Sequence, residues 1–513
     1  MKNEKKNTCL IKYEKKNIAA NLVLLIFFVL FYLYYTNNLI ESGSSRQITL
    51  QIILGVVGII SYTLAVLIRK FKLKEHHIFL IASIFMGLVY FIAIPLGKGN
   101  DETAHFLRIY EISQKYTTGK FQDSTMLPEQ FSKVSQFQFD KTIGYEHYIS
   151  NYGEFNMLSG VSKDFGNSYW NIRVYSPIQY LPQAIGVTIG RILSDNLLLI
   201  GYMGRILGYA FWVTICCISI KLIPNKKTFF VILCLLPINV ISAVCLSGDT
   251  VTNAIIMLFV ALIYRKMYLD ENIKTFEKVL LFVLSAMIAL CKIVYLPFIF
   301  LILFIDKKNF ASKKKYYLYI ILLIVVSMIV GLSWLAIGST IGTNANSGTK
   351  EQLEFILTEP FSYLIVNIRT YLSVSLNTIL QFATGNELLC HSQVMPYGII
   401  SYVVGIICLL SSLVRDDDKD YEISKWKKHF TVCIIVGTIL LIGTAIYIQW
   451  TSLFDVGGHV IAGLQGRYYI PVAALVVFIL DKIKLMDMDK KTLFVVMLLM
   501  HFSVMSDIIS FYL

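Results

Sequence analysis

Two adjacent carboxylates directly follow an apolar segment, a position that suits a general base at a membrane surface. They are Asp101 and Glu102, and the basic side chain of Lys98 precedes them. If a helix begins here, Asp101, His105 and Arg108 recur at intervals of four and three residues and therefore share one helical face. A carboxylate in this setting can accept the proton of an attacking hydroxyl. The neighbouring cations can hold a lipid phosphate or orient the base.

Helix capping explains the same residues without any chemistry. Asn100 and Asp101 are residue types that accept hydrogen bonds from the first free N–H groups of a helix. The charge of Glu102 suits the positive end of the helix dipole. Spacing alone leaves both interpretations open, so other residues must decide between them.

Further cations recur at positions that the predicted topology places on one side of a membrane. Arg205 lies early in an apolar segment, Lys292 lies at the turn of a predicted hairpin, and Arg467 stands between Gln465 and Tyr468. Positive charge is costly in a membrane and marks a function or a buried pair, although long side chains can also snorkel to the headgroups. Cations on the outer side run against the positive-inside bias. Together with the carboxylate pair, they suit an anionic lipid phosphate.

A third carboxylate, Asp249, occupies the turn Ser247-Gly248-Asp249 between two apolar segments. Asp249 either caps the helix that follows it or belongs to the polar site. The sequence favours neither interpretation over the other.

The composition determines the class of protein that must position these residues. Of the 513 residues, 56% are hydrophobic and 15% are charged, whereas soluble domains have about 45–50% apolar and about 25% charged residues. Apolar runs of roughly 18–22 residues recur, each long enough to cross ~30 Å of hydrocarbon as a helix. The sequence therefore predicts an all-α polytopic membrane protein and excludes a soluble enzyme, a disordered chain and a disulfide scaffold.

The charge and cysteine patterns exclude two further classes. Lys and Arg number 46 against 33 Asp and Glu, a net charge of +13, and most of the excess lies in short basic connectors, as expected of cytoplasmic loops. We therefore expect no nucleic-acid partner. The nine Cys lie mostly inside apolar segments without a CxxC pattern, which argues against disulfides and a zinc site.

The apolar segments predict about thirteen crossings in the cell membrane, with the N-terminus in the cytoplasm and the C-terminus outside. The basic N-terminus precedes a first span without a cleavage signal, so we expect that span to be retained. Residues 175–193, which contain two prolines, are expected to form an interfacial or re-entrant helix. The predicted spans cover residues 18–35, 48–68, 78–96, 197–220, 228–246, 251–264, a hairpin over 279–305, 316–337, 397–414, 430–449, 468–480 and 492–513.

These spans divide the chain into five predicted regions. They are an N-terminal three-helix segment (1–97), a large outer loop with the carboxylate motif and interfacial helices (98–196), a central bundle (197–337), a second outer loop with an amphipathic stretch near 361–382 (338–396), and a C-terminal bundle (397–513).

Several motifs of nucleotide-dependent and zinc-dependent enzymes are missing from the sequence. It contains no P-loop, no HExxH and no DxD in the predicted outer loops. Nucleotide sugars are cytoplasmic, so a site on the outer face would need a lipid-carried donor instead.

Six short motifs occur in order along the chain. In this order they resemble the bacterial membrane family of unknown function numbered twenty-one forty-two, which is itself similar to the GT-C superfamily of polyprenyl-phosphate-sugar-dependent glycosyltransferases. The resemblance extends from about Gly97 to Arg467. The motifs are Asp101-Glu102-x-x-His105, Tyr175-Ser176-Pro177-x-x-Tyr180-x-Pro182, Gly204-Arg205, Ser247-Gly248-Asp249, Lys292-x-x-Tyr295-x-Pro297 and Gln465-Gly466-Arg467-Tyr468.

The resemblance implies a GT-C-like fold and an inverting sugar transfer on the outer face of the cell membrane, with no metal or other cofactor. The donor would be a polyprenyl-phosphate-linked sugar, and the acceptor a glycan or glycopolymer of the cell envelope. Asp101, or less favourably Glu102, would activate the acceptor, and Arg205, Lys292 and Arg467 would contact phosphate or sugar. The other candidate binding residues are Lys98, His105, Arg108, Tyr175, Tyr180, Asp249, Tyr295, Gln465 and Tyr468.

The chain departs from the family pattern in two places: two spans come before the one that precedes Asp101, and residues 385–396 lack a Gly-Trp stretch. A transporter or flippase of lipid-linked glycans and a polysaccharide polymerase are the alternatives. A transferase predicts Asp101 on an outer cavity open to lipid with cations nearby. A flippase predicts polar residues along a path through the membrane midplane.

Overall fold

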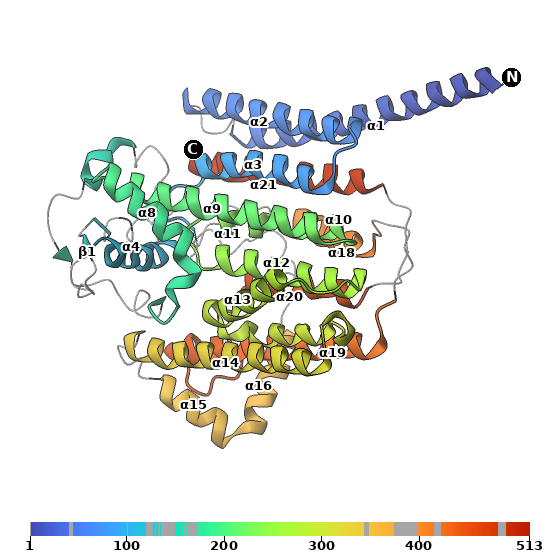
Figure 1. Cartoon of the computed structure of the whole chain (residues 1–513). Helices are drawn as coiled ribbons and strands as arrows, with labels where there is room; N and C mark the ends of the chain where they lie inside the picture. Colours follow the sequence, from blue (N-terminus) through green and yellow to red (C-terminus); the bar gives the residue numbers. More distant parts are fainter. Residues whose placement is uncertain are drawn as a thin grey trace.

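The computed structural model is a bundle of helices that run roughly side by side, with smaller helices gathered at one end around α4 (Glu102–Thr118) (Figure 1). We call this the α4 end. The structure describes residues 2–39, 45–99, 101–118, 127–128, 130–131, 134, 149–156, 161–162, 172–342, 348–373, 399–414, 422–480 and 489–513.

Eight helices of the described chain are long and apolar enough to cross a membrane. The protein is therefore a polytopic helical membrane protein, as the composition predicts. These helices are α1 (Lys2–Leu39), α2 (Ser45–Lys70), α3 (Glu75–Ala93), α9 (Leu197–Leu222), α12 (Asp249–Leu269), α14 (Lys313–Gly342), α19 (Lys425–Gln449) and α21 (Lys490–Tyr512).

Shorter elements complete the described chain, with 3₁₀ helices labelled η. The two strands have two residues each and pair antiparallel. The elements are β1 (Leu127–Pro128), η3 (Tyr152–Phe155), β2 (Val161–Ser162), η4 (Pro177–Tyr180), α8 (Leu181–Leu193), α10 (Lys227–Cys234), α11 (Pro237–Val244), α13 (Thr275–Cys291), η5 (Ile293–Phe304), η6 (Lys307–Asn309), α15 (Thr349–Thr358), α16 (Pro360–Ser373), α18 (Ile399–Leu413), η7 (Thr451–Leu453), η8 (Gly466–Tyr469), α20 (Ile470–Ala474) and η9 (Leu475–Phe478).

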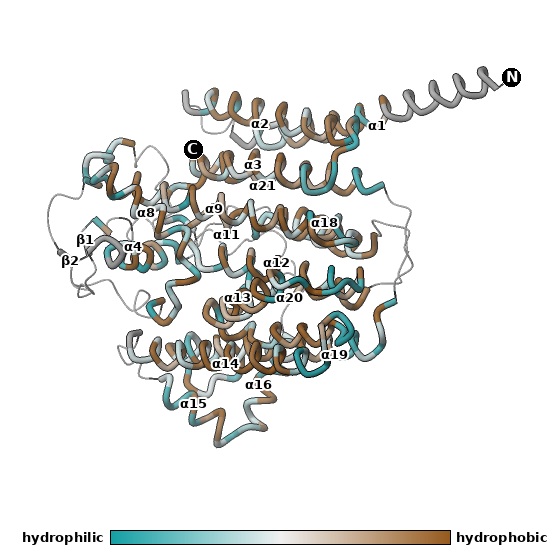
Figure 2. Tube along the Cα trace, in the orientation of Figure 1, coloured by the Kyte–Doolittle hydropathy of each residue, from teal (hydrophilic) through white to brown (hydrophobic). Residues whose placement is uncertain are grey.

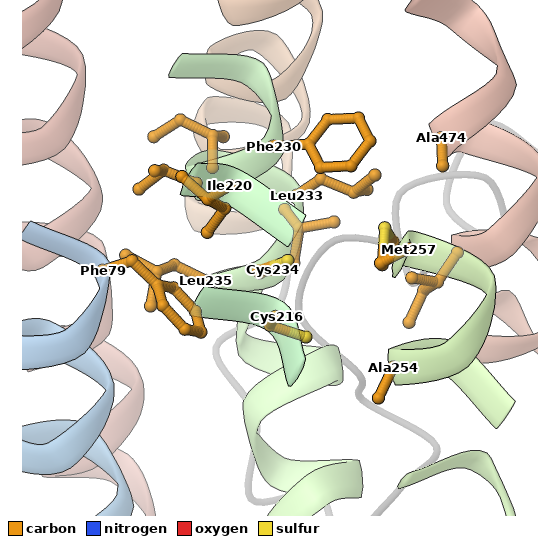
Figure 3. Close-up of a cluster of buried hydrophobic side chains, with 14 of the residues drawn as sticks. Phe79, Cys216, Ile220, Phe230, Leu233, Cys234, Leu235, Ala254, Met257 and Ala474 are labelled. Atoms are coloured by element: carbon orange, nitrogen blue, oxygen red, sulfur yellow. The ribbon is translucent and has the colours of Figure 1, made fainter. Parts of the chain in front are cut away.

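The centre of the bundle is α12, and 94% of its apolar stretch is buried within the protein. Figure 2 shows apolar residues along the long helices and more polar residues at the ends of the bundle. Around α12 the core is apolar: Met257 and Ala254 face Phe230 and Leu233 of α10 and Ala474 of α20 (Figure 3). Between helices in a membrane, such side chains hold the bundle together by close van der Waals packing rather than by removal from water. This core holds α12, and with it Asp249 at its N-terminus, in one place.

The predicted hairpin over 279–305 is confirmed in outline. Helix α13 ends at Cys291, η5 begins at Ile293, and the two ends meet again where the N–H of Ile273 donates to the carbonyl of Asn309, 3.1 Å away. Lys292 therefore stands at the tip of the hairpin.

The segment predicted to be one span over 228–246 is bent: the structure divides it into α10 and α11, which meet at 56°. The break falls at Pro237, because proline lacks the N–H that a continuous helix needs and disfavours helix at the residue before it. His501 of α21 fills the gap, with its Nε2 2.5 Å from the carbonyl oxygen of Leu235.

Helix α8, within the segment predicted to be interfacial, packs along α9. Gly186 makes this close approach possible, because a Cβ there would lie 2.3 Å from the carbonyl oxygen of Met203. In the second predicted loop, α16 is bonded to α19 through the hydroxyls of Tyr363 and Tyr371, which contact Thr444 and the carbonyl of Ile439. Residues 343–347 and 374–396 of that loop lie outside the described residues.

Basic residues gather at the end of the bundle opposite α4. The Nζ of Lys491 donates to the carbonyl of Arg69, that of Lys226 to Ser412, and that of Lys427 to Phe304. Capping carbonyls at helix ends with lysines is favourable because those groups lack partners within the helix. This end also holds ion pairs such as Lys266–Glu277 and Lys490–Glu75, but Lys and Arg are in excess in its connectors, whereas the cluster at the α4 end is balanced in charge.

Candidate active site at the α4 end of the bundle

Glu102 and Arg205 form an ion pair that is completely buried, with both side chains 0% exposed. The Nε and Nη2 of Arg205 each lie 2.7 Å from a carboxylate oxygen of Glu102. Arg205 also donates to the carbonyls of Ile94 and Pro95, at the end of the segment that begins with α3. A buried charge pair survives when other hydrogen bonds satisfy it, and this one is well satisfied.

Glu102 also accepts three backbone N–H groups, from Gly97, Gly99 and Leu246, at 2.9–3.0 Å. Its carboxylate thus ties the loop before α4 both to α9 and to the turn that leads into α12. The sequence interpretation offered Glu102 as a less favoured base and Arg205 as a phosphate contact. In the structure Glu102 and Arg205 pair with each other instead, and neither side chain is exposed.

Asp101 stands immediately before α4 in a left-handed backbone conformation, with φ of 56°. Aspartate tolerates this conformation better than most residues. The helix therefore begins one residue later than the stripe of Asp101, His105 and Arg108 assumed. The side chain of Asp101 is 40% exposed, and its Oδ2 accepts from Nη2 of Arg467 at 3.0 Å.

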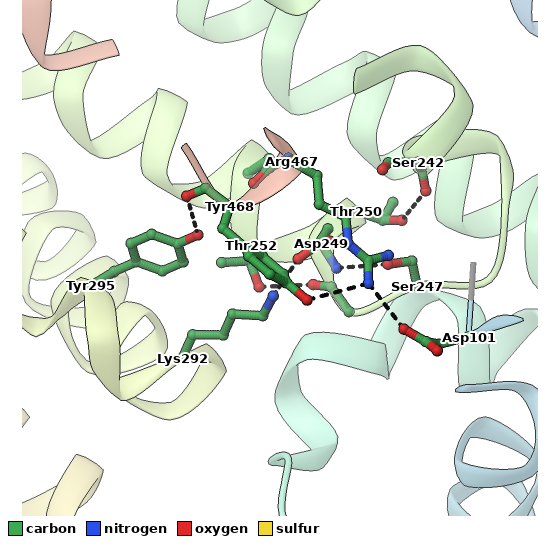
Figure 4. Close-up of polar contacts among 12 residues, drawn as sticks. Asp101, Ser242, Ser247, Asp249, Thr250, Thr252, Lys292, Tyr295, Arg467 and Tyr468 are labelled. Carbon is green, nitrogen blue, oxygen red and sulfur yellow. Dashed lines mark hydrogen bonds and ion pairs between the residues drawn. The ribbon is translucent and has the colours of Figure 1, made fainter. Parts of the chain in front are cut away.

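Four charged side chains make one cluster, shown in Figure 4: Asp101, Arg467, Asp249 and Lys292. Arg467 lies between the two carboxylates, since its Nε is 3.5 Å from Oδ2 of Asp249. The Nζ of Lys292 is 2.5 Å from the other oxygen of Asp249. Four segments far apart in sequence thus meet: the start of α4, the start of α12, the tip of the hairpin, and η8, which supplies Arg467.

The alternative interpretation of Asp249 as a helix cap is not what the structure shows. Gly248 is the N-cap residue of α12, and the N–H of Asp249 donates to Oγ of Ser247 at 3.1 Å. The carboxylate of Asp249 is left to pair with the two cations.

Tyrosine rings surround the ammonium of Lys292. The ring centroids of Tyr468 and Tyr175 lie 5.0 and 5.9 Å from its Nζ, within the range of cation–π attraction. The hydroxyl of Tyr295 donates to the carbonyl of Tyr468 at 2.9 Å, which braces η8 against the hairpin. Burial raises the pKa of Tyr175, so its phenol stays neutral.

His105 is buried beside the cluster and bonded to Tyr180 of η4, with Nδ1 and Oη 2.8 Å apart. Burial lowers the pKa of His105 to about 4. Asp101 and Asp249 act to raise this pKa and Arg467 and Lys292 to lower it, so burial is the deciding cause. Burial likewise raises the pKa of Tyr180 well above its usual value. Both groups are therefore neutral at pH 7 and form a positioning contact between α4 and η4.

We expect this histidine to make the fold sensitive to mild acid. The unfolded chain takes up a proton at His105 below pH 6.5, whereas the folded protein does so only below about pH 4. The free energy of unfolding therefore falls as the pH drops through this window, by on the order of 3 kcal/mol. His105→Gln, which can keep a bond to Tyr180, should flatten the fall in thermal stability between pH 6.5 and 4.5 in detergent. Equal slopes in variant and wild type would contradict the assignment.

The remaining sequence candidates lie in or near this region, in different surroundings. Arg108 is buried and bonds Glu111 at 2.7 Å and the carbonyl of Tyr175 at 3.3 Å, so its partner is not the cluster. Arg173 bonds the same Glu111 at 2.9 Å. Lys98 is buried in the loop before Asp101, and Gln465 is half-buried directly before η8.

An apolar pocket adjoins the cluster. It holds about 720 Å³, its open mouth included, and lies between the α13–η5 hairpin, α14, α19 and residues 174–176. Lys292, Tyr468 and Tyr175 line it together with apolar side chains. Only 22% of the apolar stretch of α14 and 33% of that of α19 are buried within the protein, so both helices present apolar surface to lipid. The pocket residues from these two helices are Gly331, Trp334, Leu335, Ile442, Ala445, Ile446 and Gln449.

Sequence reasoning missed these pocket residues and the partners of Glu102 and Arg108. Trp334 had one usable signal, because a tryptophan near the end of a span is typical of a membrane interface. Its Nε1 donates to the carbonyl of Val174 at 2.9 Å. Within the described residues, no three of His, Cys, Asp and Glu lie together in a way that could hold a metal ion.

The fold and the site together define a class: a polytopic helical membrane protein with a charged cluster where several helices meet at one end of the bundle. The chain belongs to the DUF2142 family of predicted membrane proteins, whose family model matches residues 84–476. This match confirms the family resemblance that the motifs indicate, and its range includes every residue of the cluster. Comparisons with curated proteins and with solved structures give no match.

Proposed function

We propose that this protein is a GT-C-type glycosyltransferase that moves a sugar from a polyprenyl-phosphate donor to a cell-envelope glycan or glycopolymer. One observation carries the proposal: Lys292 lines an apolar pocket between lipid-facing helices, and Asp249 connects this lysine to Arg467, which bonds the half-exposed carboxylate of Asp101. A prenyl chain suits the pocket, its phosphate suits Lys292 and Arg467, and an acceptor hydroxyl suits Asp101.

In the proposed reaction Asp101 accepts the proton of the acceptor hydroxyl as that oxygen attacks the anomeric carbon. The bond between this carbon and the donor phosphate oxygen breaks, and polyprenyl phosphate leaves with the electron pair. Lys292 and Arg467 stabilise the charge that develops on the phosphate. A single displacement of this kind inverts the configuration at the anomeric carbon.

The membrane arrangement is part of the same proposal. Basic residues at the end opposite α4 favour a cytoplasmic location for that end, which leaves the cluster on the outer face. Eight long helices, the bent pair α10–α11 and the shorter segments α13, η5, α18 and 466–478 would together give the thirteen crossings that the sequence predicts.

The proposal is tested by comparing cells with and without the protein by mass spectrometry. We expect the cells that lack it to lose one sugar from an envelope glycan and to accumulate the matching polyprenyl-phosphate sugar on the outer leaflet. If that sugar lipid accumulates on the cytoplasmic leaflet instead, the protein is a flippase. An unchanged glycan with unchanged lipid pools would contradict both functions.

A further inference from the structure

The charge balance of the cluster raises a difficulty for any anionic ligand. Two cations, Lys292 and Arg467, face two carboxylates, Asp101 and Asp249, so the four charges cancel. His105 beside them is neutral, as argued above. A phosphate that binds here must therefore displace one of the carboxylates from its cation, because adding a second anion to a filled pair is repulsive.

The two carboxylates differ in how firmly they are held. The side chain of Asp249 is 6% exposed, lies between both cations and sits at the positive end of the α12 dipole. The side chain of Asp101 is 40% exposed, and among the described residues its carboxylate bonds Arg467 alone. Exposed ion pairs contribute little, so Asp101 is the partner that is more easily displaced.

Arg467 also has unused capacity to bind an anion. Arg467 is only 4% exposed, yet within the described residues its Nε makes no hydrogen bond. The nearest carboxylate oxygen given for this Nε, Oδ2 of Asp249, is 3.5 Å away. Its Nη2 is shared between Asp101 at 3.0 Å and the hydroxyl of Tyr468 at 3.5 Å. The planar guanidinium can present two parallel N–H groups to two phosphate oxygens. A buried donor without an acceptor is costly, so a ligand oxygen here would be favourable.

We propose that Arg467 exchanges partners during the catalytic cycle: a bound phosphate takes its guanidinium, and only then is Asp101 released to act as a base. This inference rests on the proposed function and adds an order to it. Without a donor, Arg467 neutralises Asp101. With a donor, the carboxylate loses its cation and becomes a better proton acceptor. The donor must therefore bind before the acceptor is activated.

The backbone allows this exchange to be confined to side chains. Glu102, the residue after Asp101, is bonded to Arg205 and to three backbone N–H groups. The start of α4 is thus held in place while the exposed carboxylate of Asp101 rotates away from Arg467. Lys292 and Asp249 remain paired.

The first test measures binding of undecaprenyl phosphate to the full-length protein in detergent, with inorganic phosphate as a second probe. Because Asp101 competes for Arg467, Asp101→Asn is expected to bind undecaprenyl phosphate roughly two- to fivefold more tightly than wild type. The expected gain is modest because an exposed ion pair contributes little free energy. Arg467→Gln is expected to bind it less tightly. Asp455→Asn, which changes an exposed carboxylate of the segment after η7, is the control and should bind like wild type.

The second test separates exchange from simple repulsion by labelling carboxyl groups with a carbodiimide and an amine. If bound phosphate releases Asp101, its labelling should rise when undecaprenyl phosphate is added, and mass spectrometry locates the label. The same rise with inorganic phosphate would show that the headgroup suffices; a rise with the lipid alone would show that the chain is needed. Tight lipid binding without increased labelling of Asp101 overturns the exchange and leaves the glycosyltransferase proposal standing. Absence of any lipid binding overturns both.

Discussion

Asp101→Asn is expected to abolish sugar transfer while the protein remains folded and at normal abundance. Loss of a general base reduces rates by about 10²–10⁴-fold. Asparagine fits the left-handed conformation at this position at least as well as aspartate, and the ion pair that is lost is half-exposed. The variant therefore separates chemistry from folding. It should still bind the donor lipid, so polyprenyl-phosphate sugar should accumulate.

The measurement is product formation per amount of purified protein, together with the lipid-linked sugar pool in cells. Asp455→Asn is a matched control, because it removes one exposed carboxylate without touching the cluster. Normal transfer by Asp101→Asn would remove the base assignment. It would leave Asp249 as the other carboxylate of the cluster, whose position between two cations suits charge stabilisation better than proton transfer.

The class of fold and the main residues of the cluster could be predicted from sequence, because both depend on local signals. Runs of apolar residues identify helices that can cross a membrane. Asp249, Lys292 and Arg467 were identified because each is a charged residue at the edge of an apolar segment. Segment ends on one side of a membrane lie at the same depth, so three such residues have a fair chance of meeting.

The pairings themselves could not be predicted. Glu102 and Arg205 are 103 positions apart, and nothing in their spacing indicates that each satisfies the other. Both carry charge near a predicted interface, so a ligand and a buried partner explain them equally well until the packing of α4 on α9 is known. The pocket was missed for a similar reason, since five separate segments line it.

The bend between α10 and α11 was not predicted, although the sequence carries a signal for it. Pro237 lies within the apolar run, and proline interrupts helical hydrogen bonding. Hydropathy alone averages over such a residue and predicts one continuous span. The effect of proline on the helix was therefore predictable, but the mean hydropathy of the apolar run does not show it.

Breaking the buried pair is expected to have the largest effect on folding. Glu102→Gln leaves the guanidinium of Arg205 buried without a counter-charge. Arg205→Met likewise leaves the carboxylate of Glu102 buried without a counter-charge. Removing one member of a buried ion pair typically costs about 3–5 kcal/mol. Each single variant should therefore unfold at a much lower temperature than wild type in detergent. Lys308→Ala removes an exposed pair with Asp270 and should leave unfolding unchanged.

The double variant Glu102→Gln/Arg205→Met decides how the pair acts. If the single variants fail because one charge is left uncompensated, removing both charges should restore part of the lost stability, giving a strong coupling energy. Transfer should not recover to the same extent, because the bonds from Glu102 to Gly97, Gly99 and Leu246 also set the position of Asp101 relative to Asp249. A stable double variant with full activity would show that the pair only stabilises the fold. A stable double variant with impaired transfer would show that it positions the two carboxylates.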